Sequence, residues 1–145
     1  MKYKSEYAFT GLVEGQIQLL NLGKPLEAFD RYFDVSGVMF ANGELFADGA
    51  AMAREKQEPY IAAATSIRGQ IIDLKMNSEL QICVFRNRTS FTIADGTVHQ
   101  IDGLCWQQWR EGKIVEERYF DGTKMQSQID AGILDKPEIL VDTKL

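Results

Sequence analysis

Hydrophobic and polar positions follow two different periods along the chain, one helical near the start and one strand-like later. Apolar residues from Phe9 to Leu20 recur at the spacing of one helical face, which predicts a first helix over residues 4–22. A short second helix is predicted over residues 25–33, because a proline opens it and its aromatic residues fall on one side.

The next segments predict a hairpin and a third helix. Residues 35–41 read as a strand, and Asn42-Gly43 is the strongest two-residue hairpin signal in the chain, so the following residues return as a second strand. A third helix is predicted over residues 48–66, with an aspartate as its N-cap and Pro59 as a kink.

Strand-like patterns dominate from residue 67 onward and are joined by turns at Asp95-Gly96 and Glu111-Gly112. We therefore expect an α+β fold, in which a curved antiparallel sheet forms a conical barrel and about three helices cover its concave face around a pocket. Residues 1–145 are expected to form a single domain, with a peripheral tail from about residue 131. The predicted long strands span residues 67–76, 80–93, 97–109 and 114–121.

Composition narrows the function classes. The chain is 45% hydrophobic and 26% charged, with a net charge of −5 and no basic stripe, so we expect no nucleic-acid partner. No apolar run approaches the length of a membrane span, and the start lacks a signal peptide's apolar stretch, so a cytoplasmic location is expected. Cys83 and Cys105 lack metal-ligand spacing and predict reduced core thiols, and no motif requires a metal or a cofactor.

Counting outward from the two turns, each taken as a two-residue loop, sorts the strand residues onto two faces. This register places Asp102 opposite Asp121 and gathers aromatic side chains with a few polar groups on one face, which is the composition of a pocket. The residues expected to line the pocket are Phe85, Asn87, Leu104, Trp106 and Glu117 on the strands, together with Phe40 and Tyr60.

The opposite face carries charged and polar residues such as Arg86, His99 and Gln107, relieved by an apolar patch that includes Trp109. Such a patch predicts a homodimer through the outer face of the sheet. A bulge or a three-residue loop would slip the register by one residue, exchange the two faces and bring His99 inward.

The segment from Trp109 to Asp121 contains an aromatic residue, then Gly-Lys-Ile-Val-Glu, then Tyr-Phe-Asp, and is followed by Met125 and Gln128. This pattern resembles the closing hairpin of SnoaL-like proteins in the nuclear transport factor 2-like superfamily, and the order of elements fits over nearly the whole chain. The resemblance implies a conical α+β barrel, usually homodimeric. Its members include polyketide cyclases, ketosteroid isomerase-like enzymes, epoxide hydrolases and dehydratases, alongside binding and adaptor modules without chemistry.

The resemblance also indicates catalytic candidates. Asp121 matches the acid/base aspartate of the cyclase branch, whereas the histidine partner of that branch has no clear match, since His99 counts onto the opposite face. With Asp102 opposite Asp121, one carboxyl group is expected to keep its proton near neutrality, and Tyr119 or Asn87 would donate to an oxyanion. Asp121 also precedes a predicted terminal helix, so an N-cap role is the structural alternative.

Two functions remain open from the sequence. The first is a cofactor-free acid/base enzyme of isomerase, cyclase, dehydratase or hydrolase type, with Asp121, Asp102 and Tyr119 acting on a small apolar carbonyl or cyclic substrate. The second is a non-catalytic dimer that binds a small apolar molecule or a partner protein in the same cavity. An open cavity with perturbed carboxylates would favour the enzyme, and a cavity filled by aromatic side chains would favour the binding module.

Overall fold

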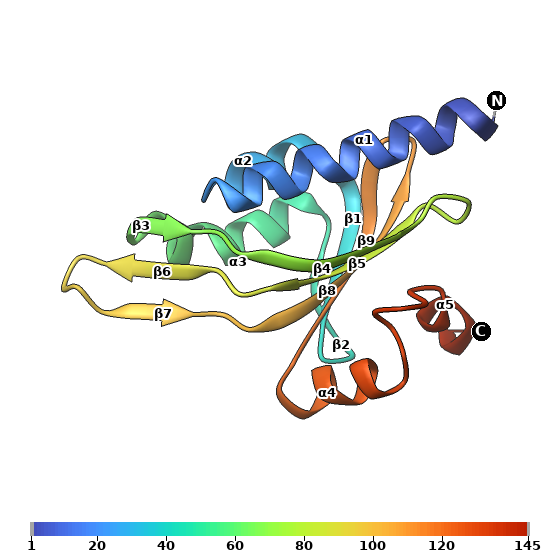
Figure 1. Cartoon of the computed structure of the whole chain (residues 1–145). Coiled ribbons are helices and arrows are strands. Elements are labelled where there is room, and N and C mark those ends of the chain that lie inside the picture. The colour runs from blue at the N-terminus through green and yellow to red at the C-terminus, as the bar shows by residue number, and fades with distance from the viewer. Residues whose placement is uncertain (1, 145) are drawn as a thin grey trace.

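The computed structural model shows a curved six-stranded sheet extended at one end by a smaller three-stranded sheet (Figure 1). The structure describes residues 2–144, with the side chains of residues 8–141. In chain order the elements are α1 (Lys2–Asn21), α2 (Pro25–Tyr32), β1 (Phe33–Ala41), β2 (Glu44–Asp48), α3 (Ala50–Ala62), β3 (Ala64–Arg68), β4 (Ile71–Asn77), β5 (Ile82–Asn87), β6 (Ser90–Ile93), β7 (Val98–Gln100), β8 (Gly103–Arg110), β9 (Lys113–Asp121), α4 (Gly122–Asp130) and α5 (Ile139–Lys144).

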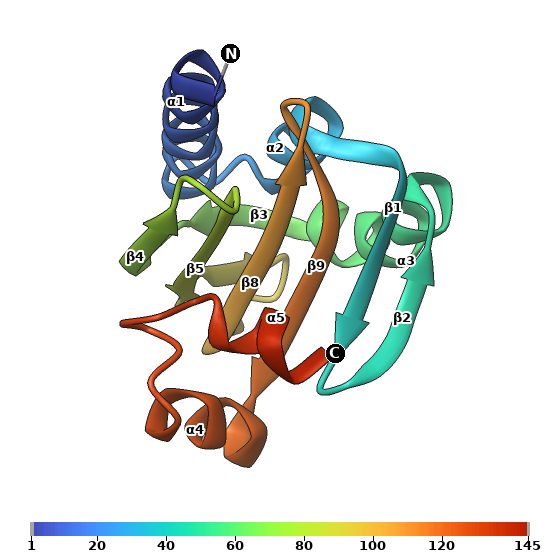
Figure 2. The ribbon, with the colours of Figure 1, turned by 90° about the vertical axis from the view of Figure 1, so that its right-hand side faces the viewer.

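The large sheet has the strand order β2-β1-β9-β8-β5-β4, and the small sheet has the order β3-β6-β7. All neighbouring strands are antiparallel except β1 and β9, which run parallel. The large sheet curves around the helices without closing into a barrel (Figure 2). The predicted α+β class, a curved sheet covered on its concave face by α1, α2 and α3, is confirmed.

The third helix is shorter than predicted. It begins after Gly49, which has a φ of 97°, and no side-chain hydrogen bond caps it, so Asp48 is not its N-cap. It ends at Ala62, because the residues that follow pair as β3 with β6, where Ala64 lies opposite Ile93. Tertiary pairing thus overrides the helix propensity of the alanines at the end of α3.

The three long strands predicted over residues 67–76, 80–93 and 97–109 are each broken into two. Their outer halves leave the large sheet and form the small one, as the diverging ribbons of β3, β6 and β7 show (Figure 1). At the first break, Gly69 lies against the end of α1, where an added Cβ would sit 1.8 Å from the carbonyl oxygen of Leu20. Only glycine permits this close approach of helix and strand.

The two faces of the large sheet carry separate hydrophobic cores. On the concave face, side chains of α1, α2 and α3 pack against the sheet, and Val13 and Trp109 are almost fully buried there. On the convex face, the C-terminal segment with α4 and α5 covers the strands (Figure 2). Ile133 in this segment is fully buried, and Trp106 donates a hydrogen bond from Nε1 to the carbonyl oxygen of Pro137 at 2.8 Å. The C-terminal segment is therefore part of a core and not a peripheral tail.

The predicted register of β8 and β9 is wrong by one residue. The turn at Glu111-Gly112 forms as expected, with Arg110 opposite Lys113, but the pairing then shifts so that Gln108 lies opposite Glu116. A bulge in β9 takes up the extra residue, Val115, which the turn signal does not reveal.

The hairpin between β6 and β7 slips in the same way. Its loop holds three residues, because the backbone N–H of Ile93 bonds to the carbonyl oxygen of Thr97 at 3.0 Å and Thr92 lies opposite Val98. Relative to the predicted register, β8 is therefore shifted by one residue against both of its neighbours, β5 and β9. Asp121 lies opposite Gly103. The expected pairing of Asp102 with Asp121 is wrong.

Candidate functional site

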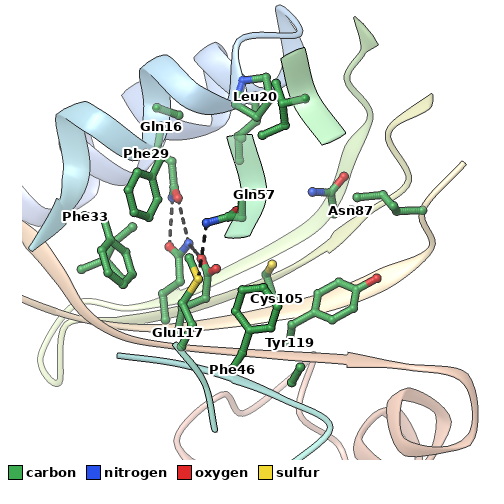
Figure 3. A pocket seen from close by; sticks show the side chains of 18 of the residues that line it. Gln16, Leu20, Phe29, Phe33, Phe46, Gln57, Asn87, Cys105, Glu117 and Tyr119 are labelled. Atoms are coloured by element: carbon green, nitrogen blue, oxygen red, sulfur yellow. Dashed lines mark hydrogen bonds between the residues drawn. The ribbon is translucent and has the colours of Figure 1, made fainter. Parts of the chain in front are cut away.

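A cavity of about 610 Å³ lies between the concave face of the sheet and the three covering helices (Figure 3). Its volume falls in the range of small-molecule sites. The wall is mostly apolar, with Phe29 of α2, Phe46 of β2 and Phe85 of β5 among its side chains. A few polar groups interrupt this wall, and the chief ones are Gln16, Gln57, Asn87, Gln107, Glu117 and Tyr119.

Most of the residues predicted to line the pocket lie at this cavity, although their role in ligand binding stays a prediction. Tyr60, which is 80% exposed, stands at its edge, and Phe40 borders it while its ring packs under the guanidinium group of Arg118 at 4.1 Å. The predicted residues that lie at the cavity are Phe40, Tyr60, Phe85, Asn87, Glu117 and Tyr119.

Leu104 and Trp106 do not line the cavity. Both are fully buried on the convex face, in the core that the C-terminal segment covers. The shift of β8 by one residue turns Cys105 and Gln107 inward in their place. The prediction for Leu104 and Trp106 is thus wrong because the predicted register is wrong.

The two aspartates predicted as an acid/base pair lie outside the cavity wall, and each side chain binds other partners. Asp121 is exposed, and its side chain accepts a hydrogen bond from Nδ2 of Asn42 at 2.8 Å. It occupies the N-cap position of α4 but makes no side-chain capping bond there. Asp102 lies in the loop before β8 and pairs with Arg86 at 2.9 Å and with Arg88 at 3.9 Å. His99 is exposed on β7, outside the cavity wall.

Glu117 is the carboxyl group that the cavity does contain. It projects from the middle of β9 toward the covering helices (Figure 3). Burial raises the pKa of this carboxyl group above its ordinary value, and a hydrogen bond from Gln107 opposes that rise in part. A carboxyl group with a raised pKa in an apolar cavity is the usual arrangement for acid/base work near neutral pH.

A buried network of amide groups holds Glu117. Gln107 is 1% exposed, and its Nε2 donates to Oε1 of Glu117 at 2.7 Å and to Oε1 of Gln16 at 2.8 Å. Its own Oε1 accepts from Nε2 of Gln16 at 2.9 Å and from Nε1 of Trp109 at 3.1 Å. Four buried or half-buried polar side chains from α1, β8 and β9 thus satisfy one another, as buried polar groups must.

Sequence reasoning missed Gln16 and Gln107. Gln16 follows Val13 and precedes Leu20 on the apolar face of α1, and a polar residue at a core position of this kind signals a buried hydrogen-bond partner. Gln107 carries no such signal, because its placement depends on the bulge in β9. The hydrophobic pattern of the first helix could therefore have identified Gln16, whereas no pattern in the sequence identifies Gln107.

Two further polar groups lie toward the other end of the cavity. Burial raises the pKa of Tyr119 to about 12, so the phenol stays a hydrogen-bond donor at neutral pH. Its ring covers Gly103, where an added Cβ would lie 2.1 Å from a ring carbon. The side-chain oxygen of Asn87 accepts from the hydroxyl of Thr89 at 2.6 Å, which leaves the Asn87 amide hydrogens for other partners.

The cysteines are free and buried, as the sequence predicts. Burial raises the pKa of both thiols, at Cys83 and Cys105, well above the ordinary value. Of residues 2–144, whose side chains are described from 8 to 141, no three or more described His, Cys, Asp or Glu side chains are placed together to hold a metal ion. Within the same span, every helix is too short or too polar to cross a bilayer.

The fold and the cavity together define a class, namely an α+β cone with a pocket between sheet and helices. The sequence matches no model of a known protein family and none of the curated proteins. Solved structures, in contrast, match over most of their length. A proposed SnoaL-like polyketide cyclase from Mesorhizobium loti is 19% identical with a TM-score of 0.63, and the match covers 77% of this chain and 97% of that one.

Two further structures show the same fold. A nuclear transport factor 2-like protein of unknown function from Exiguobacterium sp. 255-15 is 18% identical with a TM-score of 0.58, covering 74% of this chain and 95% of its own. TerC, co-crystallised with polyporic acid, is 13% identical with a TM-score of 0.59, covering 85% of this chain and 98% of its own. The chain therefore has the nuclear transport factor 2-like fold, with SnoaL-like proteins among its structural neighbours, as the closing hairpin predicts.

Proposed function

We propose that this protein binds a small, largely apolar carbonyl or cyclic molecule in the cavity and moves a proton on it, with Glu117 as the acid/base group. The observation that carries the proposal is a single carboxyl group with a raised pKa in the wall of an otherwise apolar cavity of about 610 Å³. Protein groups alone supply this chemistry, so the proposal requires no cofactor.

The other polar groups fit the same reaction. Proton removal next to a carbonyl develops negative charge on the carbonyl oxygen, and hydrogen-bond donors stabilise that charge. Tyr119 and Asn87 are the donors we assign to this task, since both lie at the cavity and both keep a hydrogen to donate. Fold neighbours described as proposed SnoaL-like polyketide cyclases, and TerC co-crystallised with polyporic acid, support a small organic substrate.

A colorimetric proton transfer tests the acid/base role. When a carboxylate base removes the ring C–H proton of 5-nitrobenzisoxazole, the N–O bond breaks, and the single product carries a nitrile group and a coloured phenolate group. We expect saturable turnover whose rate rises with pH through the raised pKa of Glu117 and then levels off, because the ionised form is the base. Glu117→Gln removes the base and should abolish turnover.

Asp121→Asn is the matched variant for the competing assignment, since it makes the same change at the exposed aspartate. It should leave the rate unchanged. Loss of turnover in Asp121→Asn, with full turnover in Glu117→Gln, would return the catalytic role to Asp121.

The non-catalytic alternative uses the same cavity. Saturable binding of 5-nitrobenzisoxazole without turnover would support a module that binds small molecules, and the proposal of catalysis would then fail.

The expected homodimer stays a prediction, and it would have to form beside the C-terminal segment, which covers much of the convex face. Sedimentation of the full chain measures that association directly.

A further inference from the structure

The orientation of the Gln107 amide group is fixed by its neighbours. The indole N–H of Trp109 can only donate, and its Nε1 lies 3.1 Å from Oε1 of Gln107. The thiol of Cys83 lies 3.4 Å from the same oxygen as a further donor. The oxygen of Gln107 must therefore face Trp109, and its NH₂ group must face away.

This orientation determines what Glu117 can do. The NH₂ group of Gln107 points to Oε1 of Glu117 at 2.7 Å, and an NH₂ group can only donate. Oε1 of Glu117 is consequently an acceptor whether the carboxyl group is ionised or neutral. When Glu117 binds a proton, that proton has to sit on the other oxygen, Oε2.

Oε2 is the oxygen left for a ligand. Among the described side chains, 8–141, none donates a hydrogen bond to Oε2 in the network that holds Oε1. The Glu117 side chain lines the same cavity as Gln57 and Cys105 (Figure 3). A neutral Glu117 thus presents one O–H donor to an apolar space.

We propose that Trp109 and Gln107 are positioning residues that keep the Glu117 proton on Oε2, so that the cavity recognises the oxygen of a neutral carbonyl ligand. The inference rests on the proposed function, because it assumes that the cavity binds a small apolar molecule. The apolar wall favours a neutral ligand over an anion, since a buried anion without a paired cation is costly. Lys56, a cation at the cavity, donates to the carbonyl oxygen of Phe46 at 2.5 Å.

Other titratable groups lie at the cavity or interact with Glu117 from the elements around it. They are Lys56 on α3, Cys83 on β5, Cys105 on β8 and Tyr119 on β9. Burial raises the pKa of both thiols and holds that of Tyr119 at about 12, so these three groups stay neutral while Glu117 ionises. A pH-dependent change in ligand preference near the pKa of Glu117 therefore reports on Glu117.

A pair of probes of the same shape tests the recognition. The ketone 2-tetralone and the hydrocarbon tetralin differ in one carbonyl oxygen, and the quantity measured is the ratio of their dissociation constants at several pH values. In the wild-type protein we expect the preference for the ketone to fall about fivefold as pH rises through the pKa of Glu117, which corresponds to one hydrogen bond. Glu117→Gln carries an NH₂ donor where the proton sits, so its preference should persist at every pH.

Trp109→Phe tests the positioning role. It removes the indole N–H, the stronger of the two donors that orient Gln107, and the thiol of Cys83 is only a weak donor, so Gln107 and Gln16 can turn together and offer an oxygen to Oε1 of Glu117. We expect the ketone preference at low pH to drop about fivefold while tetralin binds as before. Trp106→Phe is the matched control, since it makes the same change on the same strand toward the convex face, and it should leave the preference unchanged.

Infrared spectroscopy reads the proton position without a ligand. The carbonyl stretch of neutral Glu117, identified as the band that Glu117→Gln removes, should move to higher frequency in Trp109→Phe, because the free oxygen becomes the carbonyl. Gln107→Met, which removes the donor to Oε1, should give the same shift if Trp109→Phe does not fold.

If Trp109→Phe leaves both the carbonyl-stretch band of Glu117 and the ketone preference unchanged, the inference is wrong, while ligand binding and the proposed function are unaffected. If the band moves but neither probe binds the wild-type protein, the proposed function fails, and with it the recognition of a carbonyl ligand.

Discussion

The two faces of the large sheet are built from the same strands and are filled in opposite ways. On the convex face, Leu104 and Trp106 meet the C-terminal segment in a packed apolar core. On the concave face, their neighbours in β8, Cys105 and Gln107, border a cavity and a network of buried amides. The alternation of side chains along one strand thus separates a face that is packed throughout from a face whose core borders a cavity.

The difference shows how the cavity is supported. A void beneath three helices gives up packing contacts, and a buried carboxyl group adds a further cost at neutral pH. The packed side chains of the two cores offset these costs. We therefore expect substitutions in the convex core to change mainly stability, and substitutions at the cavity wall to change mainly ligand binding and pH dependence.

The largest effect should come from Trp106→Ala. This side chain is fully buried and donates to the carbonyl oxygen of Pro137, so its removal leaves a cavity and an unpaired acceptor. The free energy of unfolding, measured by urea titration, should fall by about 3–5 kcal/mol. Phe46→Ala at the cavity wall should cost less, because that ring is already only partly enclosed. Equal costs would mean that the two faces do not differ as described.

Gln107→Met should have an intermediate effect on stability. It leaves the indole N–H of Trp109 and the Gln16 amide without their partner, at a cost of about 1–3 kcal/mol in the free energy of unfolding. It also removes the hydrogen bond that lowers the pKa of Glu117, so that pKa should rise further in an NMR titration. Gln108→Met, the same change on the adjacent residue, should leave the pKa of Glu117 in place.

Glu117→Gln should have the smallest effect on stability, and one that depends on pH. The pKa of Glu117 is higher in the folded protein than in the unfolded chain, so the folded state binds the proton more tightly. The wild-type free energy of unfolding should then decline as pH rises from the ordinary glutamate pKa to the raised one. The variant should lack that decline, so the difference between the two proteins appears above this range and vanishes below it. Parallel curves would contradict a raised pKa.

The sequence predicts the fold well because its main signals are local. Asn42-Gly43 forms the expected turn with φ values of 52° and 86°, and Glu111-Gly112 does so with 51° and 80°. The site is harder to predict, since it depends on two one-residue slips, the bulge at Val115 and the three-residue loop between β6 and β7, which no turn or periodicity signal marks. The register errors place Leu104 and Trp106 on the wrong face and leave Gln107 outside the predicted pocket.

Asp121 and Glu117 illustrate the same limit. The motif around β9 draws attention to Asp121, which resembles a known acid/base residue, whereas the strand pattern predicts Glu117 only as a lining residue of the pocket. Burial separates the two carboxyl groups, and burial comes from tertiary packing that a motif does not describe. Gln16 is the exception, because the helical period alone places this polar residue on the apolar face of α1.

The parallel pairing of β1 with β9 also affects how the chain can fold during synthesis. Residues 33–41 find their central partner only in residues 113–121, so a ribosome must make β9 before the large sheet can be completed. Until then β1 can pair only with β2, and its other edge stays open to wrong partners. Such distant pairing predicts slow folding that finishes only after the last strand, β9, has been translated.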